Sequence, residues 1–89
     1  MKIVINKCYG GYSLSEEALA TLGVQYDDEV WRTDARLVKI VEADPEAASG
    51  RVAKLKVVEI PDEATDYSVE EYDGFESVIY VVDGKLHWA

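Results

Sequence analysis

The sequence predicts an α+β domain, a two-layer sandwich in which two helices cover one face of a mainly antiparallel sheet, in the order β-α-α-β-β-β-β. Three observations support this fold class. Apolar residues recur with a helical period over residues 14–22 and 34–43. Residues 51–60 and 67–88 instead alternate between apolar and polar side chains, as strands do. Two Asp-Gly pairs divide the last segment into a meander, because Asp-Gly favours a two-residue hairpin turn.

The first strand and the first helix are expected on either side of a glycine pair. Residues 2–9 begin with a β-branched run and predict a strand. Ser13 stands three residues before Glu16, the spacing of a capping box, so we expect the first helix to begin there. Gly23 follows the last apolar position and is expected to end this helix.

The second helix is expected to follow a polar connection. Thr33 is its expected cap, and Asp34 would lie favourably in its first turn. The helix is expected to end at Asp44, because a residue before proline avoids the helical region. Asp44 can then cap one further turn over residues 45–48.

The second half of the chain is expected to be all strand. Pro61 ends the alternating segment 51–60. The Asp73-Gly74 and Asp83-Gly84 pairs then connect three strands, at residues 67–72, 75–82 and 85–88.

Length and composition bound the class of protein. Eighty-nine residues predict a single domain over residues 1–89. One cysteine allows no internal disulfide, and neither a signal peptide nor a membrane span is expected. A location in a reducing compartment, the cytoplasm, is therefore predicted, with no membrane association.

The charge is strongly acidic and unevenly distributed. The net charge is −9, of which residues 61–89 carry −7, residues 31–60 carry +1 and residues 1–30 carry −3. This balance disfavours binding to duplex DNA, which requires neutralisation of phosphates. It favours a basic protein surface as a partner.

Several segments resemble a group of small bacteriophage and prophage proteins. The opening Ile5-Asn6-Lys7-Cys8-Tyr9-Gly10-Gly11-Tyr12-Ser13-Leu14-Ser15 is similar to the I-N-K-C-Y-G-G-[FY]-x-L-S opening of that group. The likeness continues in Arg32-Thr33-Asp34, Leu37-Val38, Val41-Glu42, Ala53–Pro61, Glu71-Tyr72-Asp73-Gly74 and Trp88. The resemblance implies a phage accessory protein that acts inside a bacterial host cell. It supplies no catalytic residues.

The glycine pair and its surroundings form a candidate anion site. Gly10 and Gly11 precede a helix start, where free N–H groups and the positive helix end attract anions. Ser13 lies at the same junction, and the rings of Tyr9 and Tyr12 are placed to stack on a base or ribose. No nucleotide-binding fingerprint accompanies them. The alternative is a plain strand-to-helix connection whose glycines allow a tight turn.

Arg32 and Arg36 are the candidate ligands for an anionic group. They stand four residues apart near the start of the second helix and are able to hold a phosphate or carboxylate bidentately. The alternative is an ordinary solvated helix surface, with Asp34 or Glu42 as the neighbour of Arg36.

Two other groups of residues suit a protein interface. Trp31 and Trp88 lie among polar residues, where a half-exposed ring favours stacking or protein contact, although each is also suited to close the core. The acidic last third is a candidate mimic of a phosphate backbone. Its alternative is a solvated edge that resists aggregation.

Catalysis receives little support. Cys8 and His87 are the only thiol and imidazole, and they would form a nucleophile–base pair only if the first and last strands were neighbours. No metal-ligand spacing is present. No catalytic residue, metal or cofactor is therefore expected.

The preferred interpretation is a non-catalytic protein that binds and sequesters a small anionic, nucleotide-like ligand, such as a host immune signal. Its expected ligand-binding residues are Tyr9, Gly10, Gly11, Tyr12, Ser13, Arg32 and Arg36. The alternative is an acidic inhibitor that binds a host protein, itself a candidate nucleic-acid-binding protein. Exposed strand edges are also compatible with a homo-oligomer.

Overall fold

The computed structural model describes residues 1–89 and arranges three helices and five strands in the predicted order. The elements are β1 (Lys2–Asn6), α1 (Glu16–Leu22), α2 (Ala35–Ala43), α3 (Pro45–Ala48), β2 (Leu55–Glu59), β3 (Asp66–Tyr72), β4 (Phe75–Val82) and β5 (Lys85–Trp88). The predicted α+β class is confirmed. The short α3 is the additional turn that the Asp44-Pro45 pair predicts.

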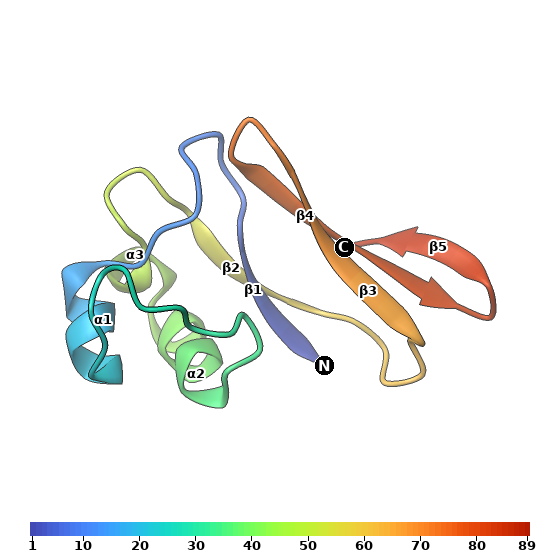
Figure 1. The fold of residues 1–89 in the computed structure, drawn as a ribbon, viewed down its shortest axis with the longest axis horizontal. Coiled ribbons are helices and arrows are strands. Elements are labelled where there is room, and N and C mark those ends of the chain that lie inside the picture. Colours follow the sequence, from blue (N-terminus) through green and yellow to red (C-terminus); the bar gives the residue numbers. More distant parts are fainter.

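The strands form two antiparallel sheets rather than the single sheet that the sequence predicts. β1 pairs with β2, and β3, β4 and β5 form a separate meander. The helices, the β1–β2 sheet and the meander follow one another across the molecule (Figure 1). β1 therefore lies in the middle and is buried on both faces over Ile3–Asn6.

β1 has one edge that does not pair with β2, and the backbone groups along this edge already have hydrogen-bond partners. Val4 N–H donates to the Arg32 carbonyl at 2.9 Å, and the Val4 carbonyl accepts from the Arg32 guanidinium at 3.2 Å. Asn6 N–H donates to the Glu76 carboxylate at 2.8 Å. A loop and a side chain thus occupy the groups that a neighbouring strand would use.

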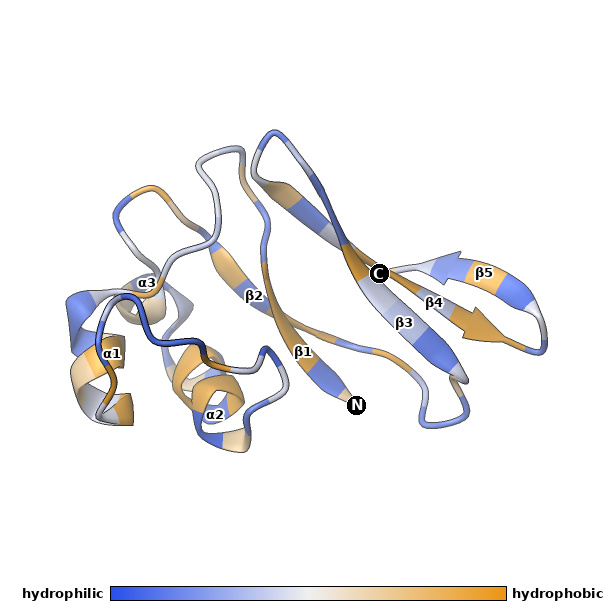
Figure 2. Ribbon diagram, viewed as in Figure 1, coloured by the Kyte–Doolittle hydropathy of each residue, from blue (hydrophilic) through white to orange (hydrophobic).

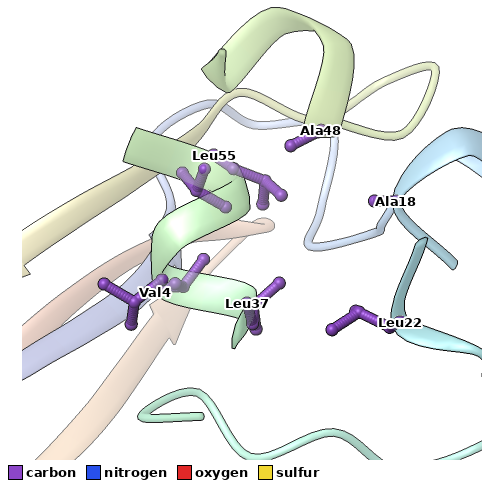
Figure 3. Close-up of a cluster of buried hydrophobic side chains, with 8 residues drawn as sticks. Val4, Ala18, Leu22, Leu37, Ala48 and Leu55 are labelled. Atoms are coloured by element: carbon purple, nitrogen blue, oxygen red, sulfur yellow. The ribbon is translucent and has the colours of Figure 1, made fainter. Parts of the chain in front are cut away.

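Two apolar clusters lie on opposite faces of β1, because successive side chains of a strand point to opposite faces. Val4 faces the helices, where eight buried residues pack together, among them Leu37 of α2 and Leu22 of α1 (Figure 3). Ile3 and Ile5 face the meander and pack with Val78 of β4 and Ile60. Hydrophobic residues accordingly concentrate on α2, β1 and β4 (Figure 2).

The helix caps differ from the prediction by one or two residues. Ser15, not Ser13, caps α1 and accepts a hydrogen bond from Ala18 N–H at 3.0 Å. Asp34, not Thr33, caps α2 and accepts from the backbone N–H groups of Arg36 and Leu37. In both cases the actual cap is the residue immediately before the first helical turn, where its side chain reaches the free donors.

Of the remaining predicted boundaries, the glycine-containing ones are confirmed, and the ends of two strands differ. Gly23 ends α1 in the left-handed region, at a φ of 72°. Both Asp-Gly turns are confirmed, and Asp73 and Asp83 adopt φ angles of 54° and 52°. The first two predicted strands are shorter than expected, since β1 ends at Asn6 and β2 begins at Leu55.

No helix of the structure is long and apolar enough to cross a membrane.

Candidate functional site

The glycine-rich loop after β1 is held between two turns. A Cβ atom on Gly10 would lie 1.7 Å from the backbone oxygen of Val52, so only glycine fits there. A Cβ atom on Gly74, in the β3–β4 turn, would lie 2.7 Å from the backbone nitrogen of Gly11. Figure 1 shows this loop beside the β3–β4 turn. Close backbone packing thus accounts for Gly10, and Gly11 adopts a φ of 93°.

Asn6, the last residue of β1, is fully buried and holds this loop in place. Its Nδ2 donates to the carbonyls of Cys8 and Gly74, each at 2.7 Å. Its Oδ1 accepts from the backbone N–H of Lys54 at 2.8 Å. One side chain therefore ties together the loop, the β3–β4 turn and the chain entering β2.

Arg32 and Tyr12 meet, as the anion-site hypothesis requires, but the arginine is already paired. The Arg32 guanidinium lies over the Tyr12 ring, 3.5 Å from its centroid. Its two terminal nitrogens donate to the two carboxylate oxygens of Glu76, at 2.7 and 2.9 Å. Glu76 is 5% exposed. The charge of Arg32 is thus neutralised by a buried partner inside the fold.

The Tyr12 hydroxyl is buried and has no hydrogen-bond partner. Burial raises the pKa of Tyr12, the Arg32 guanidinium opposes that rise, and the Glu76 carboxylate adds to it. The neutral phenol is therefore the stable form, and the ring acts as an apolar and cation-binding surface.

Arg36 lies apart from this group. It pairs with Asp34, with Nη2 to Oδ2 at 3.3 Å, and its Nη1 donates to the Leu22 carbonyl at the end of α1. The Arg36 side chain is 65% exposed. The hydrogen bonds that Arg36 donates to Asp34, from its side chain and its backbone N–H, lower the pKa of Asp34. The structure therefore brings only Arg32, of the two arginines, to the predicted loop.

A pocket of about 460 Å³ opens beside Arg32. We call it the Trp31 pocket; it is lined by Tyr12, Ser13, Leu14, Leu19, Tyr26, Asp28, Glu29, Val30, Trp31 and Arg32. Trp31 and Tyr26 are 80% and 81% exposed. Because Arg32 is neutralised, Asp28 and Glu29 determine the charge of this pocket, which is negative.

The other predicted residues lie outside the Trp31 pocket. Gly10 and Gly11 line a smaller hollow of about 360 Å³, which shares Tyr12 and Ser13 with the Trp31 pocket. Tyr9 is 68% exposed and packs on Phe75, with ring centroids 5.3 Å apart. The seven predicted residues thus divide among several surfaces, and only Tyr12, Ser13 and Arg32 share the larger pocket.

Cys8 and His87 do not meet. The Cys8 thiol donates to the Val52 carbonyl at 3.1 Å and to Asn6 Oδ1 at 3.4 Å. His87 stacks on Tyr80, with centroids 5.2 Å apart, and β1 and β5 belong to different sheets. No three His, Cys, Asp or Glu side chains are grouped in a way that would hold a metal ion.

Two residues that organise the site are not among the predicted ones. The sequence places Glu76 in the acidic last third, although residues 76, 78 and 80 of β4 lie on one side of the strand, so Glu76 shares the inward face of Val78 and Tyr80. Asn6 gives little local signal, because two of its side-chain partners, Lys54 and Gly74, are 48 and 68 residues away. No protein-family model, curated protein or solved structure matches the chain.

Proposed function

We propose that the protein is a non-catalytic binding module that docks a basic segment of a partner protein at the Trp31 pocket. One observation carries this proposal. Exposed aromatic rings and two carboxylates line the pocket, while Glu76 neutralises its only arginine. The site therefore offers contacts to a cation and an apolar stem together.

The chemistry of the pocket favours a lysine or arginine side chain. Trp31 and Tyr26 line the pocket, and the faces of such rings attract cations, while Asp28 and Glu29 supply opposite charge. Tryptophan and tyrosine are also the side chains that most often dominate protein interfaces. The long alkyl stem of a basic side chain would pack on Leu14 and Val30 while its head meets the carboxylates.

The charge of the whole chain supports the same class of partner. A net charge of −9 raises the local concentration of basic proteins and speeds their encounter. Basic surfaces of this kind are typical of nucleic-acid-binding proteins. The resemblance to phage proteins would make the partner a host protein, which is the inhibitor hypothesis drawn from the sequence.

The nucleotide-like ligand receives less support. An anion at Arg32 would have to compete with the bidentate Glu76 carboxylate, and it would approach past Asp28 and Glu29. Arg36 is committed to Asp34 and to the end of α1. The anionic ligand is therefore kept as the competing arm of the experiment.

The experiment measures the fluorescence of Trp31 in a Trp88→Phe background, so that one tryptophan reports. Titration with short Lys/Arg-containing peptides is expected to change this fluorescence, in a manner that weakens with salt. Glu-containing peptides of equal length and a panel of nucleotides are expected to leave it unchanged. Binding of nucleotides without binding of basic peptides would replace the proposal with the anionic-ligand function.

Matched variants locate the effect. Asp28→Asn with Glu29→Gln removes two charges from the pocket, whereas Glu63→Gln with Asp83→Asn removes two exposed charges elsewhere. Only the first pair is expected to weaken peptide binding beyond the general effect of net charge. Equal weakening by both pairs would reduce the proposal to non-specific attraction and reject the pocket.

A further inference from the structure

The two edges of the outer sheet are protected very differently. The strand order β3-β4-β5 leaves one unpaired edge on β3 and one on β5. The β3 segment and its turn carry carboxylates along their length, at Asp66, Glu70, Glu71 and Asp73. β5, Lys85-Leu86-His87-Trp88, carries none. Charged side chains on an edge oppose pairing with another chain. β5 has one, Lys85 at its first residue, against four carboxylates on β3 and its turn, so β5 is the less protected edge.

The backbone of β5 directs two residues toward that open edge. Val78 and Ala89 exchange both backbone hydrogen bonds, at 3.0 and 2.8 Å. Hydrogen-bonded and non-bonded pairs alternate along antiparallel strands, so His87 and Lys85 also bond to β4. Leu86 and Trp88 therefore point their N–H and C=O groups away from β4.

The same two residues expose large apolar side chains. Leu86 is 60% exposed and Trp88 is 64% exposed. They lie opposite Val81 and Ile79 of β4, on the face turned away from the β1–β2 sheet. Figure 1 shows β5 at the far side of the molecule from the helices. Open backbone groups and apolar side chains thus coincide on one short strand.

We propose that β5 pairs with β5 of a second copy, antiparallel, about a two-fold axis at His87. In this register Leu86 lies opposite Trp88 of the partner subunit, and both residues have their backbone groups directed at each other. Each such pair exchanges two hydrogen bonds, and its side chains form an apolar cross-strand contact. The two meanders become one continuous sheet.

A second copy fits this edge because the strand is complementary to itself. The register places no carboxylate side chain against another, whereas self-pairing of the β3 edge would bring the carboxylates of Asp66, Glu70 and Glu71 from both copies together along one seam. The groups that face His87 within the subunit are the Tyr80 ring, stacked on it, and Lys85 on the same face of β5. The inference concerns a different surface from the Trp31 pocket and is independent of the proposed function.

Sedimentation velocity of the full chain over a concentration series tests the proposal. The wild type is expected to form dimers as concentration rises. Leu86→Pro removes a donor that β4 does not use, so it spares the internal ladder while deleting half of the hydrogen bonds between subunits. We expect it to raise the dimer dissociation constant on the order of tenfold or more. Leu86→Ala retains the donor and should weaken the dimer less than Leu86→Pro.

Ser68→Lys is the matched control for the face of the sheet. Ser68 lies on β3 opposite Ile79, on the same outer face as Leu86 but at the other edge. Edge pairing predicts that this variant dimerises as the wild type does. Loss of the dimer in Ser68→Lys would indicate face-to-face packing and overturn the proposal. A wild type that stays monomeric, or a Leu86→Pro variant that dimerises equally well, would also overturn it. Circular dichroism confirms that each variant is folded.

Discussion

The Arg32 guanidinium holds the Glu76 carboxylate through two hydrogen bonds, of 2.7 Å from Nη1 to Oε1 and 2.9 Å from Nη2 to Oε2. The pair joins the connection before α2 to the outer sheet. Glu76 also accepts from Asn6 N–H of β1, so the same carboxylate contacts the central strand. All three layers of the fold therefore meet at this ion pair. The role of the pair is first structural, although Arg32 also lines the Trp31 pocket.

Arg32→Ala is expected to destabilise the fold. It leaves the Glu76 carboxylate buried without its cation, which costs several kcal/mol when a buried pair is broken. The Arg32 side chain is 30% exposed, so we expect the lower end of the range, about 3 kcal/mol. Urea unfolding followed by circular dichroism measures this loss.

Arg36→Ala is the matched control. Arg36 makes an exposed pair with Asp34, and such pairs contribute little to stability. We expect a much smaller change in unfolding free energy than for Arg32→Ala. Equal losses in the two variants would show that the buried position of Glu76 has no energetic consequence.

Gly10→Ala is expected to distort the loop after β1. The added Cβ atom would lie 1.7 Å from the Val52 backbone oxygen, which no side-chain rotation can relieve. We expect a loss of about 3 kcal/mol, at the upper end for overpacking. Thermal or urea unfolding measures it.

Gly11→Ala separates this clash from backbone strain. Nothing lies within 4 Å of a Cβ atom on Gly11, but its φ of 93° disfavours alanine. We expect a smaller loss, about 1 kcal/mol, from the backbone alone. If Gly11→Ala were the more damaging variant, the contact of the loop with Val52 would not be what requires glycine at position 10.

Asp34→Asn is expected to change how stability depends on pH. Asparagine caps a helix about as well as aspartate, so the cap itself remains. Hydrogen bonds from Arg36 lower the pKa of Asp34 in the folded state. The stabilisation from its ionised form is therefore fully present above the unfolded value, about 3.9, and is lost as the pH falls through the lower folded value.

The comparison uses unfolding midpoints of both proteins from neutral pH to about pH 3. The wild type should be the more stable at neutral pH, and its advantage should shrink at the acidic end. Parallel curves over the whole range would show that the Arg36 contact does not favour the ionised form of Asp34.

Local features of the fold were predictable because they depend on neighbouring residues. Both Asp-Gly turns follow from their need for positive φ angles, and the strands of the meander follow from alternation between those turns. The shift of the first cap from Ser13 to Ser15 arises because two serines offer the same chemistry. Ser15 is the one whose hydroxyl also donates to the Ala47 carbonyl of α3, at 2.6 Å, a contact 32 residues away in the sequence.

The division into two sheets and the composition of the site depend on distant contacts. The residues next to Arg32 in the sequence suggest an anion ligand. Its actual partner, Glu76, is 44 residues away and is not visible from those neighbours. From the sequence, Glu76 is grouped with the acidic residues of the last third, because a charged side chain is expected to face solvent. It nevertheless lies two residues from Val78 and therefore on the same buried face of β4. A charged residue in phase with the buried face of a strand is the signal that identifies such a partner.

The buried hydroxyl of Tyr12 yields the last prediction. It has no hydrogen-bond partner, so Tyr12→Phe removes an unsatisfied polar group and keeps the ring beneath Arg32. Because an unpaired buried hydroxyl costs about 1 kcal/mol or more, we expect Tyr12→Phe to leave stability unchanged or to raise it slightly. Urea unfolding at neutral pH measures the difference.

The two proteins should diverge further at alkaline pH. Burial raises the pKa of Tyr12 in the folded state, so the stability it contributes is complete below the unfolded value, about 10, and is lost as the pH rises toward the folded value. Phenylalanine cannot ionise, and the variant should therefore keep more of its stability there. A Tyr12→Phe variant that is clearly less stable than the wild type at neutral pH would mean that the hydroxyl is satisfied in solution, most simply by a bound water at the Trp31 pocket.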